Sequence, residues 1–386
     1  MHAERKKVFA VTGGTGFLGT HLVQRLVRDG HAVRMLVRSD PGDALRESGG
    51  MCVRGDDDVV ERVYGSLEND NDVRELLLQQ RRDDEGMYTK EDEERVVVDG
   101  VYHLAGLVVH SRRRNVVEEL QCVNVDGAVR VVRIAMELGV ARACIVSTSG
   151  TVAVRADASI SADDESNGDG MHTYAELARQ WPYYKSKIDM EQAVSTMTKT
   201  MEGECPVTEI VMVRPSLLLG PGDRRLSSCK TVADLLKRRL PIVPPGGLNF
   251  VDVRDAADAS VAAFEKGDNG EKYLIAGPNL TTERFFQEVT TRACVPMPRL
   301  RLPAWLTIFI AKMINAVLTL IGKWNATFDP VLAEMGCAFW YVDDTSAAES
   351  NAQLGIHMRD WGTTIDDTIE WLRQFEVDEE AKAKAA

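Results

Sequence analysis

The chain has 386 residues and a formal net charge of −13, with 44% hydrophobic and 27% charged residues. This length can hold a large core with a smaller appended lobe, and the acidic balance excludes general nucleic-acid binding, which needs a basic face. The seven cysteines are scattered without a CxxC pair, so the sequence predicts neither a disulfide framework nor a metal site and favours a reducing, cytoplasmic compartment.

The first expected element is a strand, a glycine turn and a helix start over residues 8–19, VFAVTGGTGFLG. Gly13, Gly16 and Gly19 recur at intervals of three, which allows a tight turn, close approach to a pyrophosphate and close packing of the helix on the strand. A helix N-terminus adds free N–H groups and partial positive charge. A glycine turn alone is weak evidence, but a second strand over 31–37 completes the pattern and predicts a dinucleotide site.

The second strand, residues 32–37, is followed by Arg38, with Arg34 on the same side. An acidic residue near this point would accept a hydrogen bond from a ribose 2′-hydroxyl, whereas an arginine can pair with a 2′-phosphate. Arg38 therefore favours NADP(H) over NAD(H). NAD(H) stays open, and the alternative interpretation of Arg38 is a solvated surface arginine.

The following elements alternate between strand and helix. A third strand over 61–64 leads to a turn at Gly65-Ser66-Leu67, and the charged stretch 81–95 has no apolar period and predicts an exposed insertion. A fourth strand over 96–106 ends in small residues, a helix covers 121–138, and a strand over 143–147 ends in a cluster of hydroxyls. This alternation predicts a doubly wound parallel sheet with ligands at the carboxyl ends of its strands.

A helix is expected after Pro182, and it places Tyr183 and Lys187 one turn apart on one face. A tyrosine with a pKa of about 10 is a poor acid or base at neutral pH, but a nearby ammonium would lower that pKa. Ser149, with Thr148 as the alternative, would hold the substrate oxygen. The spacing of Tyr183 and Lys187 by itself is also common in surface helices.

The glycine turn, the hydroxyl cluster and the Tyr183–Lys187 pair, in this order, resemble the short-chain dehydrogenase/reductase superfamily, specifically its extended branch, the NAD-dependent epimerase/dehydratase superfamily. Further matches are DGVYHLAG at 99–106, NVDG at 124–127, VRPSLLLGPGD at 213–223 and NFVDVRDAADA at 249–259. Within that branch the chain is most similar to the dihydroflavonol-4-reductase-like group, related to 3β-hydroxysteroid dehydrogenases, through FWYVD at 339–343, LG at 354–355 and TIEWL at 368–372.

The resemblance implies a Rossmann fold and a role for each matching residue. Tyr183 would exchange a proton with the substrate oxygen, Lys187 would lower its pKa and bind the nicotinamide ribose, and Ser149 would hydrogen-bond the same oxygen. The cofactor contacts implied are Gly13, Thr15, Gly16, Phe17 and Leu18 at the pyrophosphate, Pro215 and Ser216 beside the nicotinamide, and Arg38, Ser66, Leu67, Leu104, Ala105, Gly106, Ser147 and Thr148 elsewhere. Ser66 and Gly106 depart from the aspartate and alanine common in the family, which affects cofactor affinity rather than the reaction.

The same pattern predicts the domain organisation. Residues 1–216 would form the NADP-binding Rossmann domain, and 217–376 would form mainly a substrate-binding lobe, with 249–276 returning to the Rossmann domain. Residues 377–386 are expected to be a flexible tail.

Residues 302–322 are the most apolar stretch and are about long enough to span a bilayer. Lys312 and Asn315 interrupt this stretch, which favours a helix covering an apolar substrate cleft over a membrane anchor. Peripheral attachment to a membrane as a hydrophobic flap stays open.

Three functions fit these patterns. The first is an NADPH-dependent reductase or dehydrogenase acting on a carbonyl or alcohol of a hydrophobic or aromatic small molecule. The second is a nucleotide-sugar epimerase or dehydratase with tightly held NAD, against which Arg38 and the Pro244-Pro245-Gly246-Gly247 stretch argue. The third is a non-catalytic NADP-binding sensor or scaffold. The substrate, the physiological direction and a homodimeric state are left open by the sequence.

Overall fold

A seven-stranded parallel sheet forms the larger part of the computed structural model, which describes residues 6–38, 59–80, 95–155, 176–201, 208–322 and 329–385. The strand order is β13-β9-β7-β6-β1-β2-β3. The bounds are β1 (Val8–Thr12), β2 (Ala32–Val37), β3 (Val60–Tyr64), β6 (Gly100–His103), β7 (Arg142–Val146), β9 (Glu209–Pro215) and β13 (Lys272–Ile275). This sheet confirms the predicted doubly wound α/β fold.

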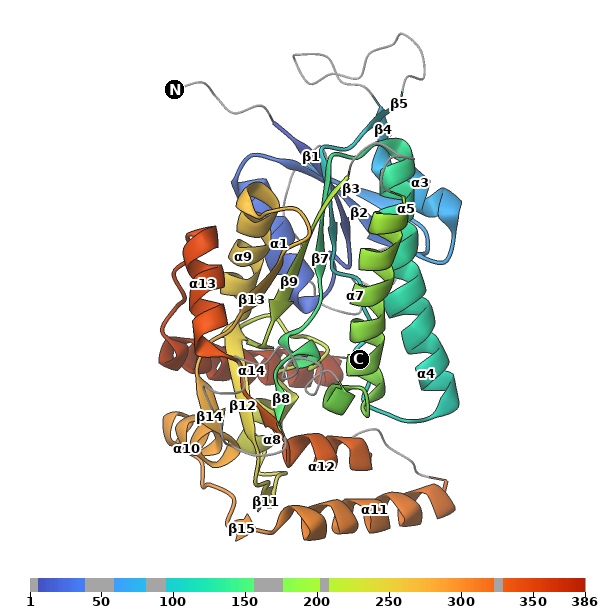
Figure 1. Ribbon diagram of the computed structural model, residues 1–386. Coiled ribbons are helices and arrows are strands. Elements are labelled where there is room, and N and C mark those ends of the chain that lie inside the picture. Colours follow the sequence, from blue (N-terminus) through green and yellow to red (C-terminus); the bar gives the residue numbers. More distant parts are fainter. Residues whose placement is uncertain are drawn as a thin grey trace.

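Helices cover both faces of this sheet (Figure 1). One face carries α1 (Phe17–Arg28) and α9 (Val253–Lys266), and the other carries α3 (Asp70–Leu77), α5 (Gly127–Leu138) and α7 (Pro182–Thr200). Successive residues of a strand point to opposite faces, so Phe9 and Val11 enter one core cluster while Ala10 enters the other. Both faces of β1 are buried, which explains its unbroken apolar run.

The strand expected over 96–106 is two strands in the structure. β5 (Arg95–Val97) pairs antiparallel with β4 (Leu78–Gln80), outside the large sheet, and only β6 joins β1. Between them, the Asp99 carboxylate accepts the Val8 N–H at 2.7 Å, and the Asp99 N–H donates to the Val8 carbonyl at 2.9 Å. Asp99 therefore lies where the pairing of β5 with β4 has ended, and its two hydrogen bonds to Val8 set the register of β6 on β1. Residues 81–94 of the expected insertion lie outside the described residues.

The helix expected over 121–138 is preceded by α4 (Arg114–Leu120) and begins with a π-helical turn at Gln121–Asp126. This turn places Asn124 in the interior, where its amide donates to the Leu107 carbonyl at 3.0 Å and to Ser186 Oγ at 2.9 Å. The amide oxygen accepts the Leu107 N–H at 2.7 Å. Asn124 therefore joins the loop after β6 to helix α7.

A smaller sheet lies at the opposite end of the molecule from the N-terminus (Figure 1). It contains β10 (Leu217–Leu219), β12 (Gly247–Asp252), β16 (Phe339–Trp340) and β8 (Val154–Arg155), with β14 (Asn279–Thr281) paired to β12. The helices α8 (Lys230–Leu236), α10 (Thr282–Arg292) and α14 (Trp361–Ala385) pack around it, and α13 (Asp344–Leu354) packs against α9 and β13. Segment 249–276 thus contains the end of β12 in the small sheet, then α9, which covers the large sheet, and β13, which is a strand of the large sheet.

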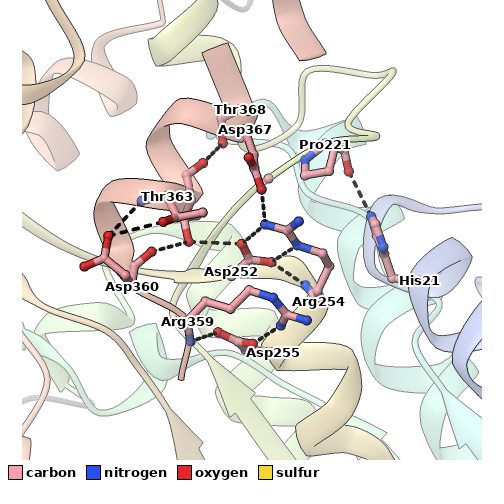
Figure 2. Close-up of polar contacts among 12 residues, drawn as sticks. His21, Pro221, Asp252, Arg254, Asp255, Arg359, Asp360, Thr363, Asp367 and Thr368 are labelled. Atoms are coloured by element: carbon pink, nitrogen blue, oxygen red, sulfur yellow. Dashed lines mark hydrogen bonds and ion pairs between the residues drawn. The ribbon is translucent and has the colours of Figure 1, made fainter. Parts of the chain in front are cut away.

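A buried polar cluster joins the two sheets (Figure 2). Asp252 ends β12 and caps α9 by accepting the Arg254 N–H at 2.8 Å, and it also accepts Thr364 Oγ1 of α14 at 3.0 Å. The Arg254 guanidinium bonds both Asp252 and Asp367 of α14 at 2.6 Å. Helix α14 then continues to Ala385, past the point where a flexible tail was expected, because Ala, Lys and Glu are strong helix formers.

The apolar stretch 302–322 forms α11 (Ala304–Leu320), which packs against α12 (Pro330–Gly336). Thr307 is the buried residue of α11. Helix α12, and not α11, contributes to the apolar cluster that contains Tyr184, through Val331 and Met335. The expectation that α11 covers a substrate cleft stays a prediction. In the described part of the chain, no helix combines the length and apolarity needed to cross a bilayer.

Candidate active site

The glycine turn after β1 lies against the loop that follows β6. Gly13 has φ +72°, and a side chain there would bring its Cβ within 2.6 Å of the Ala105 nitrogen. A Cβ at Gly19 would meet the Gly13 carbonyl, so the helix and the turn touch through backbone. Helix α1 has no side-chain cap at Gly16 and no acidic residue in its first turn, so its first N–H groups are free for an anion. The arrangement fits a pyrophosphate at Gly13, Thr15, Gly16, Phe17 and Leu18.

Two buried polar atoms at the carboxyl ends of the strands lack partners within the described structure. His103, the last residue of β6, contacts Thr12 Oγ1 through Nδ1 at 2.8 Å, but its Nε2 is unpaired. The Ser216 hydroxyl, directly after β9, is unpaired as well. Burial lowers the pKa of His103 to about 3, so its ring is neutral at physiological pH. These atoms, with Leu104, Ala105, Gly106 and Pro215 around them, fit a polar ligand at this edge of the sheet.

Lys187 is buried at the carboxyl ends of β6 and β7. Its ammonium donates to the Val146 carbonyl at 3.0 Å, and it lies 3.4 Å from the place where a Gly106 Cβ would stand. Burial lowers the pKa of Lys187 to about 8, against the opposing charge of Glu191. The lysine predicted from the sequence therefore lies at the edge where ligands of doubly wound sheets bind.

Glu191, one turn further along α7, is the centre of a network that the sequence analysis missed. Its carboxylate accepts hydrogen bonds from Ser147 Oγ at 2.6 Å, Arg214 Nε at 3.0 Å and Lys272 Nζ at 3.1 Å. Burial raises the pKa of Glu191, but the Arg214 hydrogen bond and the charges of Arg214 and Lys272 outweigh it and bring the pKa to about 2. The Ser147 hydroxyl donates to Glu191 and the Ser147 N–H donates to the Val213 carbonyl at 2.8 Å, so the cofactor contact expected from Ser147 stays a prediction. The repeat of polar residues at 187 and 191 on a buried helix face is the signal that could have found it.

Tyr183 is buried among aromatic rings at the start of α7. Its ring makes edge-to-face contacts with the rings of His110 and Tyr184, with centroid separations of 5.4 Å and 4.9 Å. Burial raises the pKa of Tyr183, whereas the sequence predicted a lower pKa through Lys187. That prediction is wrong for the protein alone, because the phenol lies in an apolar setting and the Lys187 ammonium is bonded to the Val146 carbonyl.

Ser149 begins a tight turn, Ser149–Thr151, which is separated from the end of β7 by Ser147 and Thr148, and its side chain is buried. The Thr148 hydroxyl caps this turn by accepting the Gly150 N–H at 3.3 Å, and its own O–H is left to donate, so both Ser149 and the alternative, Thr148, stay predictions for the substrate oxygen. The Tyr184 ring lies in the space that a Gly150 side chain would fill. Helix α7 and the Ser149 turn are therefore in direct contact, which brings the elements of Ser149 and Tyr183 together.

The residues predicted to bind the adenosine end of the cofactor lie after β2 and β3. Arg38 is exposed after β2, whereas Arg34 bonds the Leu76 carbonyl at 3.1 Å and pairs with Glu61. At the Ser66 turn, the Ser66 N–H donates to the Asp72 carboxylate at 2.8 Å. The carbonyl of Leu67 accepts Arg130 at 2.6 Å. Arg38 is therefore exposed, whereas Arg34 is bonded to neighbouring elements, and within the described residues no carboxylate pairs with Arg38.

Residues 9–276 match the sequence profile of the NAD dependent epimerase/dehydratase family. The chain belongs to this family. The match covers the glycine turn, the Ser149 turn, the Tyr183–Lys187 pair and β13, which confirms the predicted resemblance to the extended branch.

Relatives within the family include reductases and sterol enzymes. A putative dihydroflavonol 4-reductase from Synechocystis is 26% identical, over 95% of this chain and 94% of the relative. Sterol demethylase protein B from Methylococcus capsulatus is 30% identical, over 76% of each chain. Among solved structures, gox2253 has a TM-score of 0.67 at 21% identity, covering 96% of this chain and 98% of the other, and MoeE5 in complex with UDP-glucose and NAD has 0.64 at 18%, covering 95% and 99%. At these identities, the structures show that the family fold is shared.

Proposed function

We propose that this family member is an NADP(H)-dependent reductase that interconverts a carbonyl and an alcohol on a hydrophobic or aromatic small molecule. The observation that carries the proposal is the position of Lys187 and Tyr183. The ammonium lies at the carboxyl ends of β6 and β7, and the phenol one turn earlier is buried among His110 and Tyr184. A solvated surface pair would have neither feature.

Each residue of the pair has a role that follows from its surroundings. Burial raises the pKa of Tyr183 and makes its phenol a weaker acid in the protein alone, so in the loaded site the Lys187 charge has to offset this burial for the phenol to give its proton to a carbonyl oxygen. Ser149 hydrogen-bonds the same oxygen, and Lys187 binds the nicotinamide ribose and stabilises the phenolate that remains. The cofactor, when bound, supplies the hydride.

The aromatic cluster next to Tyr183 supports an apolar or aromatic substrate. The ring of Tyr184 stacks on the ring of Trp340 of β16 with their centroids 4.5 Å apart, and the ring centroids of Trp340 and Trp181 are 5.0 Å apart. Planar rings and methyl groups pack favourably against such side chains, whereas a sugar needs many hydrogen bonds. The reductase and sterol enzyme names of the relatives support the same substrate class.

The preference for NADP(H) depends on Arg38, whose exposed guanidinium is suited to a 2′-phosphate. NAD(H) use is the alternative, and it would go with the second candidate, a nucleotide-sugar epimerase or dehydratase. MoeE5, whose structure holds UDP-glucose and NAD, is the observation that favours this candidate. A non-catalytic sensor would leave the buried Lys187 unexplained.

The proposal also covers the cellular location, the partners and the domain organisation of the enzyme. We place it in the cytoplasm, with residues 302–322 in peripheral contact with a membrane, and with no nucleic-acid partner. The division into an NADP-binding domain (1–216) and a substrate lobe (mainly 217–376) stays a prediction, for which limited proteolysis with and without NADPH is the test.

The decisive experiment is a screen of hydrophobic ketones and aldehydes followed by NADPH absorbance, with NADH and UDP-glucose arms beside it. Oxidation of NADPH by an aromatic or alicyclic ketone, lost in the Tyr183→Phe protein, supports the proposal. Co-purified NAD with turnover of UDP-glucose would replace it with the epimerase function.

A further inference from the structure

Helix α11 exposes an apolar stripe that the proposed reaction does not use. Trp305, Phe309, Met313, Val317 and Leu320 recur every three or four residues and therefore lie along one side of the helix. Trp305 is 70% exposed and Leu320 is 86% exposed. On the opposite side of α11 Thr307 is buried, and α11 packs against α12. An exposed apolar surface of this extent, on a protein with ordinary composition elsewhere, indicates a partner.

The charge around α11 is opposite to that of the whole protein. Residues 289–328 contain no aspartate or glutamate and five basic residues, although the chain has a net charge of −13. Lys312 flanks the apolar stripe, one turn from Phe309. Among the described cations of this segment, Arg301 pairs with Glu283 at 2.7 Å, Arg292 pairs with Asp366 at 2.6 Å and Lys312 approaches Glu334 at 3.9 Å, which leaves Arg299 without a carboxylate. This end of the molecule is therefore suited to an anionic surface.

A pocket of about 330 Å³ lies between the end of α8 and the segment that leads into β15 (Leu300–Arg301) and α11. Its floor is apolar, with Leu235, Leu240 and Met297, and two cations line it, Arg238 and Arg299. Both arginines are exposed, and among the described residues no carboxylate pairs with either guanidinium. An apolar floor beside two arginines fits a group with both a phosphate and a hydrocarbon part.

We propose that α11 and this pocket dock on an anionic lipid membrane, with the apolar stripe in the interface and Arg238 and Arg299 on lipid phosphates. The helix lies along the surface, since amphipathic segments of this kind enter only the headgroup and upper acyl region. Helix α12 packs against α11 and contributes Val331 and Met335 to the cluster at Tyr184, so the docking face lies one helix away from the elements of the proposed active site. The docking itself does not depend on the proposed reaction.

The test is co-sedimentation of the full chain with vesicles of phosphatidylcholine alone or mixed with phosphatidylglycerol. We expect binding to the mixed vesicles that falls as salt rises, and a loss of about fivefold for Arg238→Gln or Arg299→Gln. The double variant Phe309→Glu with Val317→Glu should lose binding altogether. Matched controls are Arg114→Gln, an exposed arginine of α4, and Val377→Glu, an exposed valine of α14, which should bind as the wild type does.

Three results would overturn the proposal. The first is equal binding to both vesicle types, and the second is full binding by the double variant. The third is a lipid-free dimer that the double variant converts to monomer while no vesicle binding is seen, since α11 would then join two copies of the chain. The Tyr183→Phe protein should bind vesicles normally, so failure of the reaction and failure of the docking are distinguishable.

Discussion

The ammonium of Lys187 donates a hydrogen bond to the carbonyl oxygen of Val146, the last residue of β7, over 3.0 Å. This bond holds a lysine with a pKa of about 8 at the carboxyl edge of the parallel sheet, beside the loop after β6. Because Tyr183 is one turn earlier on the same helix, the strand end positions both members of the pair.

Replacing Tyr183 with phenylalanine should remove the proton donor while keeping the ring in its aromatic packing. We expect kcat to fall about a hundredfold or more, with NADPH affinity close to that of the wild type. Steady-state turnover and a nucleotide titration measure the two effects. Tyr184→Phe is the control, because it keeps the stacking on Trp340 and removes a hydroxyl without a proposed chemical role. Unchanged turnover in Tyr183→Phe would remove this residue from the mechanism.

Lys187 should make the stability of the protein depend on pH in the alkaline range. Its pKa is about 8 when folded and 10.5 for an ordinary solvated lysine, so the unfolded chain binds more protons between these values and stability rises with pH there. Relative to Lys187→Met, the wild type should gain up to about 3 kcal/mol between pH 8 and pH 10.5. Urea unfolding at several pH values measures the difference. Lys185→Met, an exposed lysine of the same helix, should show no such trend.

Glu191→Gln should destabilise the protein by about 3 to 5 kcal/mol, because it leaves Arg214 and Lys272 without their buried carboxylate. The folded pKa of about 2 is below the ordinary glutamate value of 4.5, so this contribution is full above pH 4.5 and is lost as pH falls toward 2. The gap between wild type and variant in chemical unfolding should therefore shrink over that range. Glu118→Gln, which breaks only an exposed pair with Arg114, should stay within about 0.5 kcal/mol.

Arg38→Asp tests the choice of cofactor. If the guanidinium pairs with the 2′-phosphate, the dissociation constant for NADPH should rise by at least about tenfold while that for NADH changes little. Titration with each nucleotide measures both constants, with Arg114→Asp as the control for the change in charge. Equal losses for the two nucleotides would show that Arg38 does not distinguish them.

Gly150→Ala should disturb the site through packing, because its new methyl group would meet the Tyr184 ring. We expect a loss of about 1 to 3 kcal/mol in stability and a lower kcat. The Tyr184→Ala change removes the ring, so adding Gly150→Ala to it should have little further effect on stability. Additive losses in the double-mutant cycle would mean that the two residues do not share this space.

The sequence by itself determined the features that depend on local spacing. The glycine turn, the alternation of strand and helix, and the Tyr183–Lys187 turn all follow from residues close together in the chain, and the structure confirms the doubly wound sheet. The split of one expected strand at Asp99 was missed because its partner, Val8, is distant in sequence. The sequence likewise could not show that α11 packs against α12 and contributes no residue to the apolar cluster that contains Tyr184.

Only the tertiary structure decided the electrostatics of the site. Burial raises the pKa of Tyr183 and lowers the pKa of Lys187. How deeply each side chain is buried cannot be predicted from the five-residue motif that contains them. Glu191 becomes a buried anion because β9 and β13 bring Arg214 and Lys272 to it from other parts of the chain. Local geometry depends on residues that are neighbours in the sequence. The solvation and charge pairing of a side chain depend instead on which distant segments pack around it and exclude water.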